Sequence, residues 1–419
     1  MMTQTENKPF DIRFDRVVEA YREVRANKGS HGVDNVTLEA YEEDLQGNLY
    51  KLWNRMSSGS YFPQAVRGVE IPKKTGNGKR KLGVPVISDR VAQGVVKREL
   101  EILLEPVFDE SSYGYRRNRG VYDAVKAARG RCWTYKWTVD IDIVSFFDEI
   151  PHDLLMKAVR KHTSCKWHLL YIERWLKAPI RQTDGQLVQR TKGTPQGSVV
   201  SPVLANLFLH YCMDEWLRRN LPDCPFERYA DDGLVHCKTE KQARYVRGRL
   251  EERFRQCGLR LHEEKTKIVY CGTGKEAVEG TIREFDFLGY TFRRRASRNK
   301  QGGTFTGFLP AISKRAAKSI RQQVKEMESL RLTDSNLRDI AIELNPKTRG
   351  WFESYGKFYP SELKRQLTFI NKRLARWAKR KFKRFKGSQW SALKWLGKTA
   401  KVVPMLFEHW KRGVIPYVR

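Results

Sequence analysis

The chain has 419 residues, of which 80 are Lys or Arg and 48 are Asp or Glu, so its formal net charge is +32 at pH 7. This length can bury a sizeable core and fits two or three subdomains. The surplus of cations exceeds what solubility needs and predicts a polyanionic partner, most often nucleic acid. An aromatic content of 11% argues for a folded protein rather than a basic coating.

Composition also excludes several classes of protein. The seven cysteines include no Cys-x-x-Cys pair, which argues against a disulfide framework and against a zinc ribbon. No apolar run approaches the roughly 20 residues that a membrane span needs. The first ten residues are polar and lack a signal-peptide core. We therefore expect reduced thiols, no membrane association and a cytoplasmic location.

The N-terminal part is expected to be a helical extension over residues 1–65. Apolar residues recur at helical spacing from Phe14 to Ala26, and residues 27–34 then read NKGSHGVD. The two glycines predict a loop, and Asp34 can cap the helix that follows. A helix–loop–helix packing unit explains this pattern without any ligand.

Two basic segments come next in the chain. Residues 71–85, IPKKTGNGKRKLGVP, predict a hairpin with a lysine-rich tip, which is either a solvated edge or a source of cations for a triphosphate. After a helical pattern over 89–105, residues 112–120 read SYGYRRNRG. Aromatic rings that stack on bases, interleaved with arginines that meet phosphates, suit a nucleic-acid strand. Arg116 can equally be the partner in a structural ion pair.

Acidic residues interrupt two apolar stretches. Residues 137–152 read WTVDIDIVSFFDEIPH, and residues 226–237 read FERYADDGLVHC. The Asp-Gly pair in the second stretch predicts a hairpin turn. Adjacent carboxylates repel each other, and a hard divalent cation such as Mg²⁺ relieves that repulsion. A solvated hairpin tip is the alternative for this pair alone.

A strand end that presents Asp142 beside this turn would bring three carboxylates together, with Asp231 and Asp232. Such a group fits two metal ions roughly 3.5–4 Å apart that clamp the oxygens of a phosphoryl transfer. Between the two stretches, residues 193–206 read GTPQGSVVSPVLAN, a Gly/Pro loop that becomes a helix.

These blocks, in this order, resemble a reverse transcriptase of the bacterial group II intron type. The resemblance rests on Asp-Ile-x-x-Phe-Phe-Asp from residue 142, the Pro-Gln-Gly…Ser-Pro…Ala-Asn block and Tyr-Ala-Asp-Asp from residue 229, and it extends over nearly the whole chain. It implies an α+β fold, a right-hand polymerase whose fingers and palm contain an antiparallel sheet at 66–300. An all-α thumb and maturase RNA-binding domain would follow at 311–419.

The resemblance implies attack of a primer 3′-hydroxyl on the α-phosphate of a dNTP, templated by RNA. The catalytic residues would be Asp142, Asp231 and Asp232, which with the Ile143 carbonyl would hold two Mg²⁺ ions. Registering Phe-Phe-Asp…His on the family motif places the first acid at Asp142 rather than at Asp140 or Asp148.

Further roles follow from the same resemblance. Nucleotide-binding positions would be Lys73 (with Lys74 as a substitute), Arg80, Ile143, Phe147, Gln196 and Lys265. Phe147 would lie under the sugar and clash with a 2′-hydroxyl, unless it is only a core residue. Lys265 would sit near the leaving pyrophosphate as a general acid. The block at 285–290 would be a hairpin that supports the primer end.

The C-terminal region is strongly basic, since residues 311–419 hold 27 Lys and Arg against 8 Asp and Glu. A basic amphipathic helix can serve a membrane surface or a partner helix, but its place behind a polymerase favours structured RNA. Residues 345–351 (NPKTRGW) and 406–410 (LFEHW) resemble the maturase domain, and the basic segment 293–303 is expected to be the seam before it. RNA contacts are expected at Lys28, Arg116, Lys379, Arg380, Lys383 and Arg384.

The predicted function is that of an RNA-directed DNA polymerase that also binds group II intron RNA to assist splicing and retrohoming. Its partners would be that RNA, an RNA template with a DNA primer, dNTPs and a DNA target site. A domesticated reverse transcriptase of a phage-defence or CRISPR system is one alternative, and an RNA-folding maturase with a vestigial polymerase is another. His409 is the only histidine after His262, so no His/Cys-rich endonuclease domain is expected.

Overall fold

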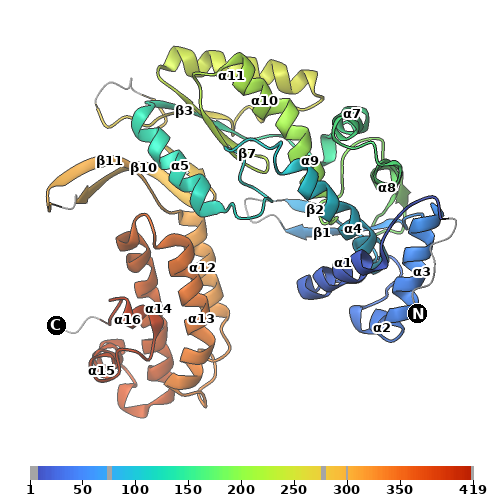
Figure 1. Ribbon diagram of the computed structural model, residues 1–419. Helices are drawn as coiled ribbons and strands as arrows, with labels where there is room; N and C mark the ends of the chain where they lie inside the picture. Colours follow the sequence, from blue (N-terminus) through green and yellow to red (C-terminus); the bar gives the residue numbers. More distant parts are fainter. Residues whose placement is uncertain (1–7, 73–77, 275–279, 299–300, 417–419) are drawn as a thin grey trace. The chain divides into compact units, whose positions relative to one another are not determined.

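The computed structural model describes residues 8–72, 78–274, 280–298 and 301–416 (Figure 1). The chain divides into two compact units. The first comprises residues up to Ala124 together with Val139–Lys267, and the second comprises Val125–Thr138 together with Ile268–Arg419. The expected α+β fold, with antiparallel sheets followed by a helical C-terminal region, is confirmed.

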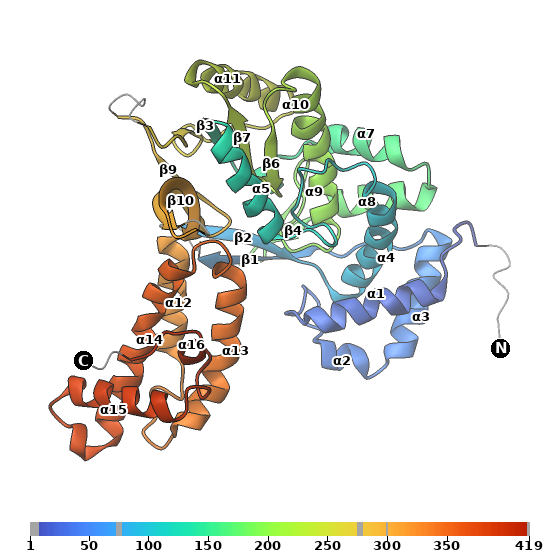
Figure 2. The ribbon, with the colours of Figure 1, turned by 60° about the vertical axis from the view of Figure 1, so that its left-hand side comes forward.

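The first unit begins with four helices, α1 (Phe14–Asn27), α2 (Leu38–Glu42), α3 (Leu45–Ser58) and α4 (Ile87–Leu104). The predicted helix over 14–26 is confirmed as α1, whose apolar face packs against α4 (Figure 2). Asp34 is not the cap of the next helix, because Thr37 Oγ1 accepts the Ala40 N–H at 3.3 Å. Asp34 instead accepts the N–H of Val36 in the preceding turn.

The predicted basic hairpin is also present. Strands β1 (Val66–Pro72) and β2 (Lys79–Val84) pair antiparallel. Strands β4 (Ile180–Arg181) and β5 (Leu187–Val188) extend this sheet in the order β2-β1-β4-β5, with β4 parallel to β1. Lys73 and Lys74 lie outside the described residues, so only the strands of this hairpin are placed.

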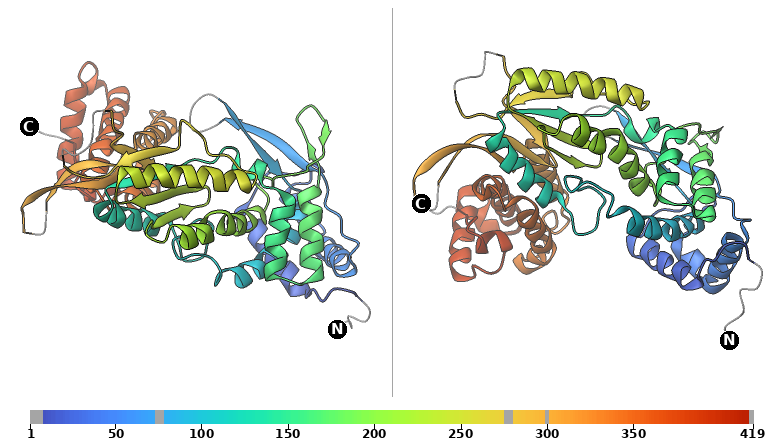
Figure 3. Two further views of the ribbon diagram at one scale, coloured as in Figure 1. Left: turned by 90° about the horizontal axis from the view of Figure 1, so that it is seen from above. Right: turned by 45° about the horizontal axis from the view of Figure 1, so that its top comes forward.

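A second sheet carries the acidic hairpin. Strand β6 (Phe226–Tyr229) pairs antiparallel with β7 (Asp232–Cys237), and β7 neighbours β3 (Trp137–Ile141). Figure 3 shows α11 (Glu240–Gln256) lying along this sheet, where it packs against β7. The remaining helices of this part of the chain are α5 (Val121–Thr134), α6 (Phe146–Glu149), α7 (His152–His162), α8 (Lys166–Lys177), α9 (Ser201–Leu209), the π-helical segment η1 (His210–Asp214) and α10 (Glu215–Asn220).

The turn between β6 and β7 is not the predicted Asp-Gly turn. Tyr229 pairs with Asp232, so the two turn residues are Ala230 and Asp231, and Gly233 lies inside β7 opposite Arg228. The positive φ that the turn requires belongs to Ala230, at +56°. Tertiary contacts therefore override the local preference for glycine at this turn.

After Val125–Thr138, the second unit continues with β8 (Lys267–Tyr270), whose first residue belongs to the first unit, and with a meander of β9 (Glu284–Phe287), β10 (Tyr290–Arg298) and β11 (Thr304–Ile312). The expected hairpin at 285–290 is confirmed as the β9–β10 turn. The expected seam at 293–303 is wrong, because β10 and β11 pair over nine residues each. The run of exposed cations explains the error: Arg293 and Arg294 are both exposed and resemble a polar linker, whereas Phe292 is buried and stacks on Phe285 with 4.8 Å between ring centroids.

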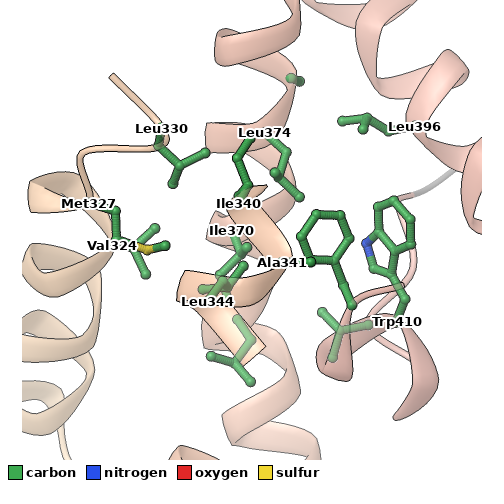
Figure 4. Packing of buried hydrophobic residues seen from close by; sticks show 14 of the residues in the cluster. Val324, Met327, Leu330, Ile340, Ala341, Leu344, Ile370, Leu374, Leu396 and Trp410 are labelled. Atoms are coloured by element: carbon green, nitrogen blue, oxygen red, sulfur yellow. The ribbon is translucent and has the colours of Figure 1, made fainter. Parts of the chain in front are cut away.

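Helices form the rest of the second unit: α12 (Lys314–Glu326), α13 (Leu337–Tyr355), α14 (Pro360–Lys381), the 3₁₀ turn η2 (Lys383–Phe385), α15 (Gln389–Val402) and α16 (Glu408–Lys411). One buried cluster joins them, and Figure 4 shows Val324 of α12, Leu344 of α13 and Leu374 of α14 converging there with Trp410 of α16. Burying large apolar side chains such as these contributes about 1.5–3 kcal/mol each, so this core holds the basic helices in place.

Two expectations from composition bear on the whole chain. All seven cysteines are free thiols, as predicted. Among the described residues, no helix combines the length and the apolar character that crossing a membrane would take.

Candidate active site

The acidic hairpin places Asp231 in its turn and Asp232 at the start of β7, while Asp142 directly follows β3. Asp231 is half-buried, Asp232 is exposed, and the Asp142 side chain is 40% exposed. Burial raises the pKa of Asp231, and the negative charge of Asp142 raises it further. The carboxylates of these two residues therefore lie within electrostatic reach of each other.

Two predicted nucleotide-binding residues meet beside this pair. Arg80 Nε of β2 donates a hydrogen bond to Gln196 Oε1, and the charge of Arg80 opposes the rise in the pKa of Asp231. The Gly83 N–H donates to the Gln196 carbonyl at 2.8 Å. A Cβ at Gly197, which has φ +118°, would lie 2.7 Å from the Gly83 oxygen, so this loop approaches β2 too closely for any other residue.

The Ile143 carbonyl is available as a ligand, because the hydrogen bonds beside it are made by its neighbours. The Val144 N–H donates to Arg260 O at 2.9 Å, and the His262 N–H donates to Asp142 O at 2.8 Å. Ile143 is thus in a non-hydrogen-bonded position of this antiparallel bridge.

Lys265 lies close to the predicted catalytic acid. Its Nζ is 3.8 Å from Asp142 Oδ1, and its side chain is 61% exposed. The next residue fixes the segment, since the Asp142 N–H donates to Thr266 Oγ1 at 3.3 Å. The exposed Lys265 ammonium therefore lies near the Asp142 carboxylate, on a segment that is hydrogen-bonded to the Asp142 backbone.

Phe147 is buried, with 6% of its surface exposed, and packs edge-to-face on Phe146 with 5.3 Å between ring centroids. Its carbonyl accepts the N–H of Thr194 at 2.7 Å, which ties the Gly-Thr-Pro-Gln-Gly loop to the segment after β3. Both interpretations of Phe147, core residue and sugar contact, are compatible with this position.

Tyr115 belongs to the same site, although the sequence analysis assigned it no role. Its backbone has φ +57°. Burial raises the pKa of its phenol, the charges of Asp231 and Asp232 raise it further, and Arg80 lowers it. The available signal was a tyrosine between glycine and arginine in residues 112–120, which only a structure can place beside the acids.

The RNA-binding prediction is wrong for Arg116, and its ion-pair alternative holds. Its side chain is only 3% exposed and pairs with Glu105 at 2.7 Å. It also donates to the carbonyls of Asp109 at 2.6 Å and Ser112 at 2.8 Å. The Arg116 guanidinium is therefore engaged in bonds that hold the loop in which it lies. Lys28, by contrast, ends α1 with φ +47° and is exposed.

The four basic residues expected to contact RNA at the end of α14 fall into two groups. Arg380 donates to the Leu330 carbonyl, and Arg384 lies over the ring of Phe385 at 4.8 Å, so both have structural contacts. Within the described part of the chain, neither Lys379 nor Lys383 forms a hydrogen bond or an ion pair with another side chain.

Two further arginines share this surface and were missed. Arg373 and Arg376 precede Arg380 by seven and four residues, which places all three on one face of α14. Burial lowers the pKa of Arg373, and the charges of Arg376, Arg380 and Arg331 lower it further. Like charges gathered without an acid favour a polyanionic partner.

Whether the residues fit a metal ion depends on the donor atoms. Within the described residues, no three His, Cys, Asp or Glu side chains converge closely enough to hold one ion together. The donor chemistry nevertheless fits a hard divalent cation, because a half-buried carboxylate whose pKa is raised by a second carboxylate is stabilised by an added positive charge. The free carbonyl of Ile143 is a further oxygen donor.

Acids on a β-hairpin turn lie beside an arginine of β2 and a glutamine of a neighbouring loop, an arrangement that suits the phosphoryl transfer of a template-directed polymerase. Known proteins supply the family. Residues 71–292, more than half of the chain, match the family described as "Reverse transcriptase (RNA-dependent DNA polymerase)". Residues 317–396 match "Group II intron, maturase-specific domain". The chain belongs to the reverse transcriptase family and is an RNA-directed DNA polymerase.

The chain is also similar to individual known proteins. The chain is 31% identical to protein YkfC of Escherichia coli over 330 residues, which cover 67% of this chain and 81% of YkfC. It is 32% identical to the group II intron-encoded protein LtrA of Lactococcus lactis over 201 residues, which cover 48% of this chain and 33% of LtrA. Among solved structures, telomerase from Candida albicans is 13% identical, with a TM-score of 0.47, over 90% of this chain and 67% of that one.

Proposed function

We propose that the enzyme extends a DNA primer on an RNA template, with Asp142, Asp231, Asp232 and the Ile143 carbonyl as the ligands of two Mg²⁺ ions. The observation that carries this proposal is the placement of the acids, since Asp142 directly follows β3 while Asp231 and Asp232 lie at the turn into β7, the strand next to β3. When bound, the metal ions supply charge stabilisation at the attacking and leaving oxygens of the phosphoryl transfer.

We assign triphosphate binding, proton donation and sugar selection to residues of the chain itself. Arg80 offers a fixed guanidinium to the triphosphate, held in orientation by Gln196. The glycine at 197 lets the loop that carries Gln196 lie directly against β2, beside Arg80. Lys265, whose ammonium is 3.8 Å from Asp142 Oδ1, is placed to give a proton to the leaving pyrophosphate. Phe147 excludes the ribose 2′-hydroxyl.

We further propose that the C-terminal helices bind group II intron RNA, to assist splicing and insertion at a DNA target site. Support comes from the maturase-specific match over 317–396 and from the basic face of α14, where Arg373, Arg376 and Arg380 gather without an acid. Cations on one helix face can follow the closely spaced phosphates of a folded RNA.

A competition binding assay tests this second proposal. The full chain is bound to the intron RNA encoded around its gene and challenged with an unrelated structured RNA of equal length, at two salt concentrations. We expect a preference for the intron RNA that persists at the higher salt, together with faster splicing of that intron. Equal affinity for both RNAs and no stimulation of splicing would leave a reverse transcriptase without maturase function.

A further inference from the structure

A fully buried arginine lies next to the acidic turn. Arg228 of β6 is 0% exposed, and its partner Asp214, at the end of the π-helical segment η1, is also 0% exposed. Arg228 Nε donates to Asp214 Oδ1 at 2.7 Å, and Nη2 donates to Oδ2 at 2.6 Å. This is a bidentate ion pair, which fixes the plane of the guanidinium.

The remaining nitrogen of Arg228 reaches the turn itself. Nη1 donates to the Ala230 carbonyl at 3.1 Å and to Asn206 Oδ1 at 2.9 Å. Ala230 has φ +56°, a conformation that a non-glycine residue keeps only where its surroundings impose it. The bond to its carbonyl orients the peptide plane that leads directly into Asp231.

Asn206 and Arg228 also connect the turn to the segment that contains Tyr113 and Gly114. Asn206 Nδ2 donates to the Gly114 carbonyl at 2.7 Å. The Tyr113 N–H donates to the Arg228 carbonyl at 2.8 Å. A Cβ at Gly114 would lie 2.4 Å from the Ala230 nitrogen, so the segment before Tyr115 presses directly on the turn. Arg228 therefore contacts both the turn and Asn206, the residue that holds this segment.

Stability alone does not explain a buried charge pair here. Desolvating two ions costs several kcal/mol, and replacing such a pair by apolar residues of similar volume is often neutral or stabilising. A hydrophobic pair at these positions would fill the same space but could not bond the Ala230 carbonyl.

We propose that Arg228, held by Asp214 and Asn206, is a positioning residue that sets the Ala230 carbonyl and thereby aims the Asp231 carboxylate in the polymerase reaction. This inference rests on the proposed catalytic role of Asp231. It assigns a function to the arginine that precedes Tyr-Ala-Asp-Asp and to an aspartate 17 residues before Asp231 in the sequence.

The test compares three variants of the full chain. Arg228→Met/Asp214→Leu replaces the buried pair by apolar residues. Arg228→Lys keeps the positive charge but loses the planar guanidinium that makes the bidentate ion pair. The matched control, Glu227→Leu/His236→Leu, removes a second buried polar pair of the same hairpin, in which His236 Nε2 lies 2.6 Å from Glu227 Oε2 and both side chains are 0% exposed. Each is measured for thermal stability, for kcat and KM of dNTP addition at varied Mg²⁺, and for amide hydrogen exchange over residues 226–237.

We expect Arg228→Met/Asp214→Leu to fold, but to lose about 100-fold in kcat with little change in the KM for dNTP, since a displaced catalytic group costs that much. Its half-saturating Mg²⁺ concentration should rise, and exchange should accelerate at the turn amides while the strand amides stay protected. Arg228→Lys should recover only part of kcat, and the control should stay close to wild type.

Wild-type kcat and turn protection in the folded Arg228→Met/Asp214→Leu variant would overturn the proposal. An equal loss in the control would also overturn it, because the effect would then belong to any buried pair of the hairpin. Failure of the underlying site assignment is distinguishable, since Asp231→Asn would then remain active whatever the Arg228 variants do.

Discussion

We propose Phe147 as the residue on which the choice of sugar depends. Replacing it by valine removes ring volume where we propose that the ribose 2′-hydroxyl is excluded. We expect the rNTP/dNTP ratio of kcat/KM to rise about tenfold, which corresponds to about 1.4 kcal/mol of lost discrimination. Steady-state primer extension with both nucleotide types measures it. The control is Phe146→Val, since Phe146 is the neighbouring buried ring. A ratio that moves equally in both variants would make Phe147 a core residue.

Because His409 is buried, we expect the stability of the C-terminal helices to fall in acid. Its Nε2 lies 2.9 Å from Asn371 Oδ1, and burial lowers its pKa to about 3. In the unfolded chain its pKa is about 6.5, so the unfolded state binds the extra proton as pH falls. Its contribution to stability is therefore complete above about pH 6.5 and is lost progressively towards pH 3.

Between pH 7.5 and pH 5.5, His409 should lower the free energy of unfolding by about 1.4 kcal/mol. Hydrogen exchange over residues 360–381 should show it as faster opening of α14 in the wild type. His409→Gln, whose amide can still donate to Asn371, should remove this part of the pH dependence. Identical pH profiles for the two proteins would show that His409 is not buried as a neutral ring.

At the scale of elements, the basic residues at the end of α14 and just after it fall into lysines that we expect to contact RNA and arginines that bond within the protein. Lys379→Gln/Lys383→Gln removes two charges without disturbing a bond within the protein. The logarithmic salt dependence of intron RNA binding should become shallower by about 1.5, because each phosphate contact contributes roughly 0.7–0.9. The matched control is Lys364→Gln/Arg365→Gln, at the other end of the same helix, where Arg365 pairs with Glu362 at 2.7 Å. Equal slopes for the two variants would contradict an RNA surface at this position.

The sequence was most informative for elements with a clear period. The helix from Phe14 and the hairpin of β9 and β10 follow from apolar spacing and turn residues, because local sequence decides both. It was misleading at residues 293–303, where the adjacent exposed arginines Arg293 and Arg294 of β10 resemble a linker when read without the sheet. The turn at Ala230 could not be predicted either, since distant residues impose its positive φ.

The candidate site shows the same limit. The three acids, Gln196 and Arg80 could be selected from motifs, because polymerase chemistry needs those groups. Tyr115 and Arg228 could not, since their roles depend on which loops lie against the hairpin turn. Arg116 was misassigned because an exposed arginine and one that bonds its own loop look alike in a sequence.

At the scale of the whole molecule, the residues that we propose for catalysis and the face of α14 that we propose for binding intron RNA belong to different compact units. The acids lie in the first unit, whereas the basic face of α14 lies in the second. A substitution confined to one unit should therefore leave the function proposed for the other largely intact.

The most direct measurement is primer extension on an RNA template by Asp231→Asn, which preserves the size of the side chain and removes its charge. The control is Asp184→Asn, an exposed acid in the β4–β5 turn that accepts the Gln186 N–H at 2.9 Å. We predict that Asp231→Asn loses at least about 10³-fold in rate, because uncompensated charge in the transition state costs several kcal/mol, while it binds RNA normally and Asp184→Asn stays active. Extension by Asp231→Asn at close to the wild-type rate would contradict the assignment of the site.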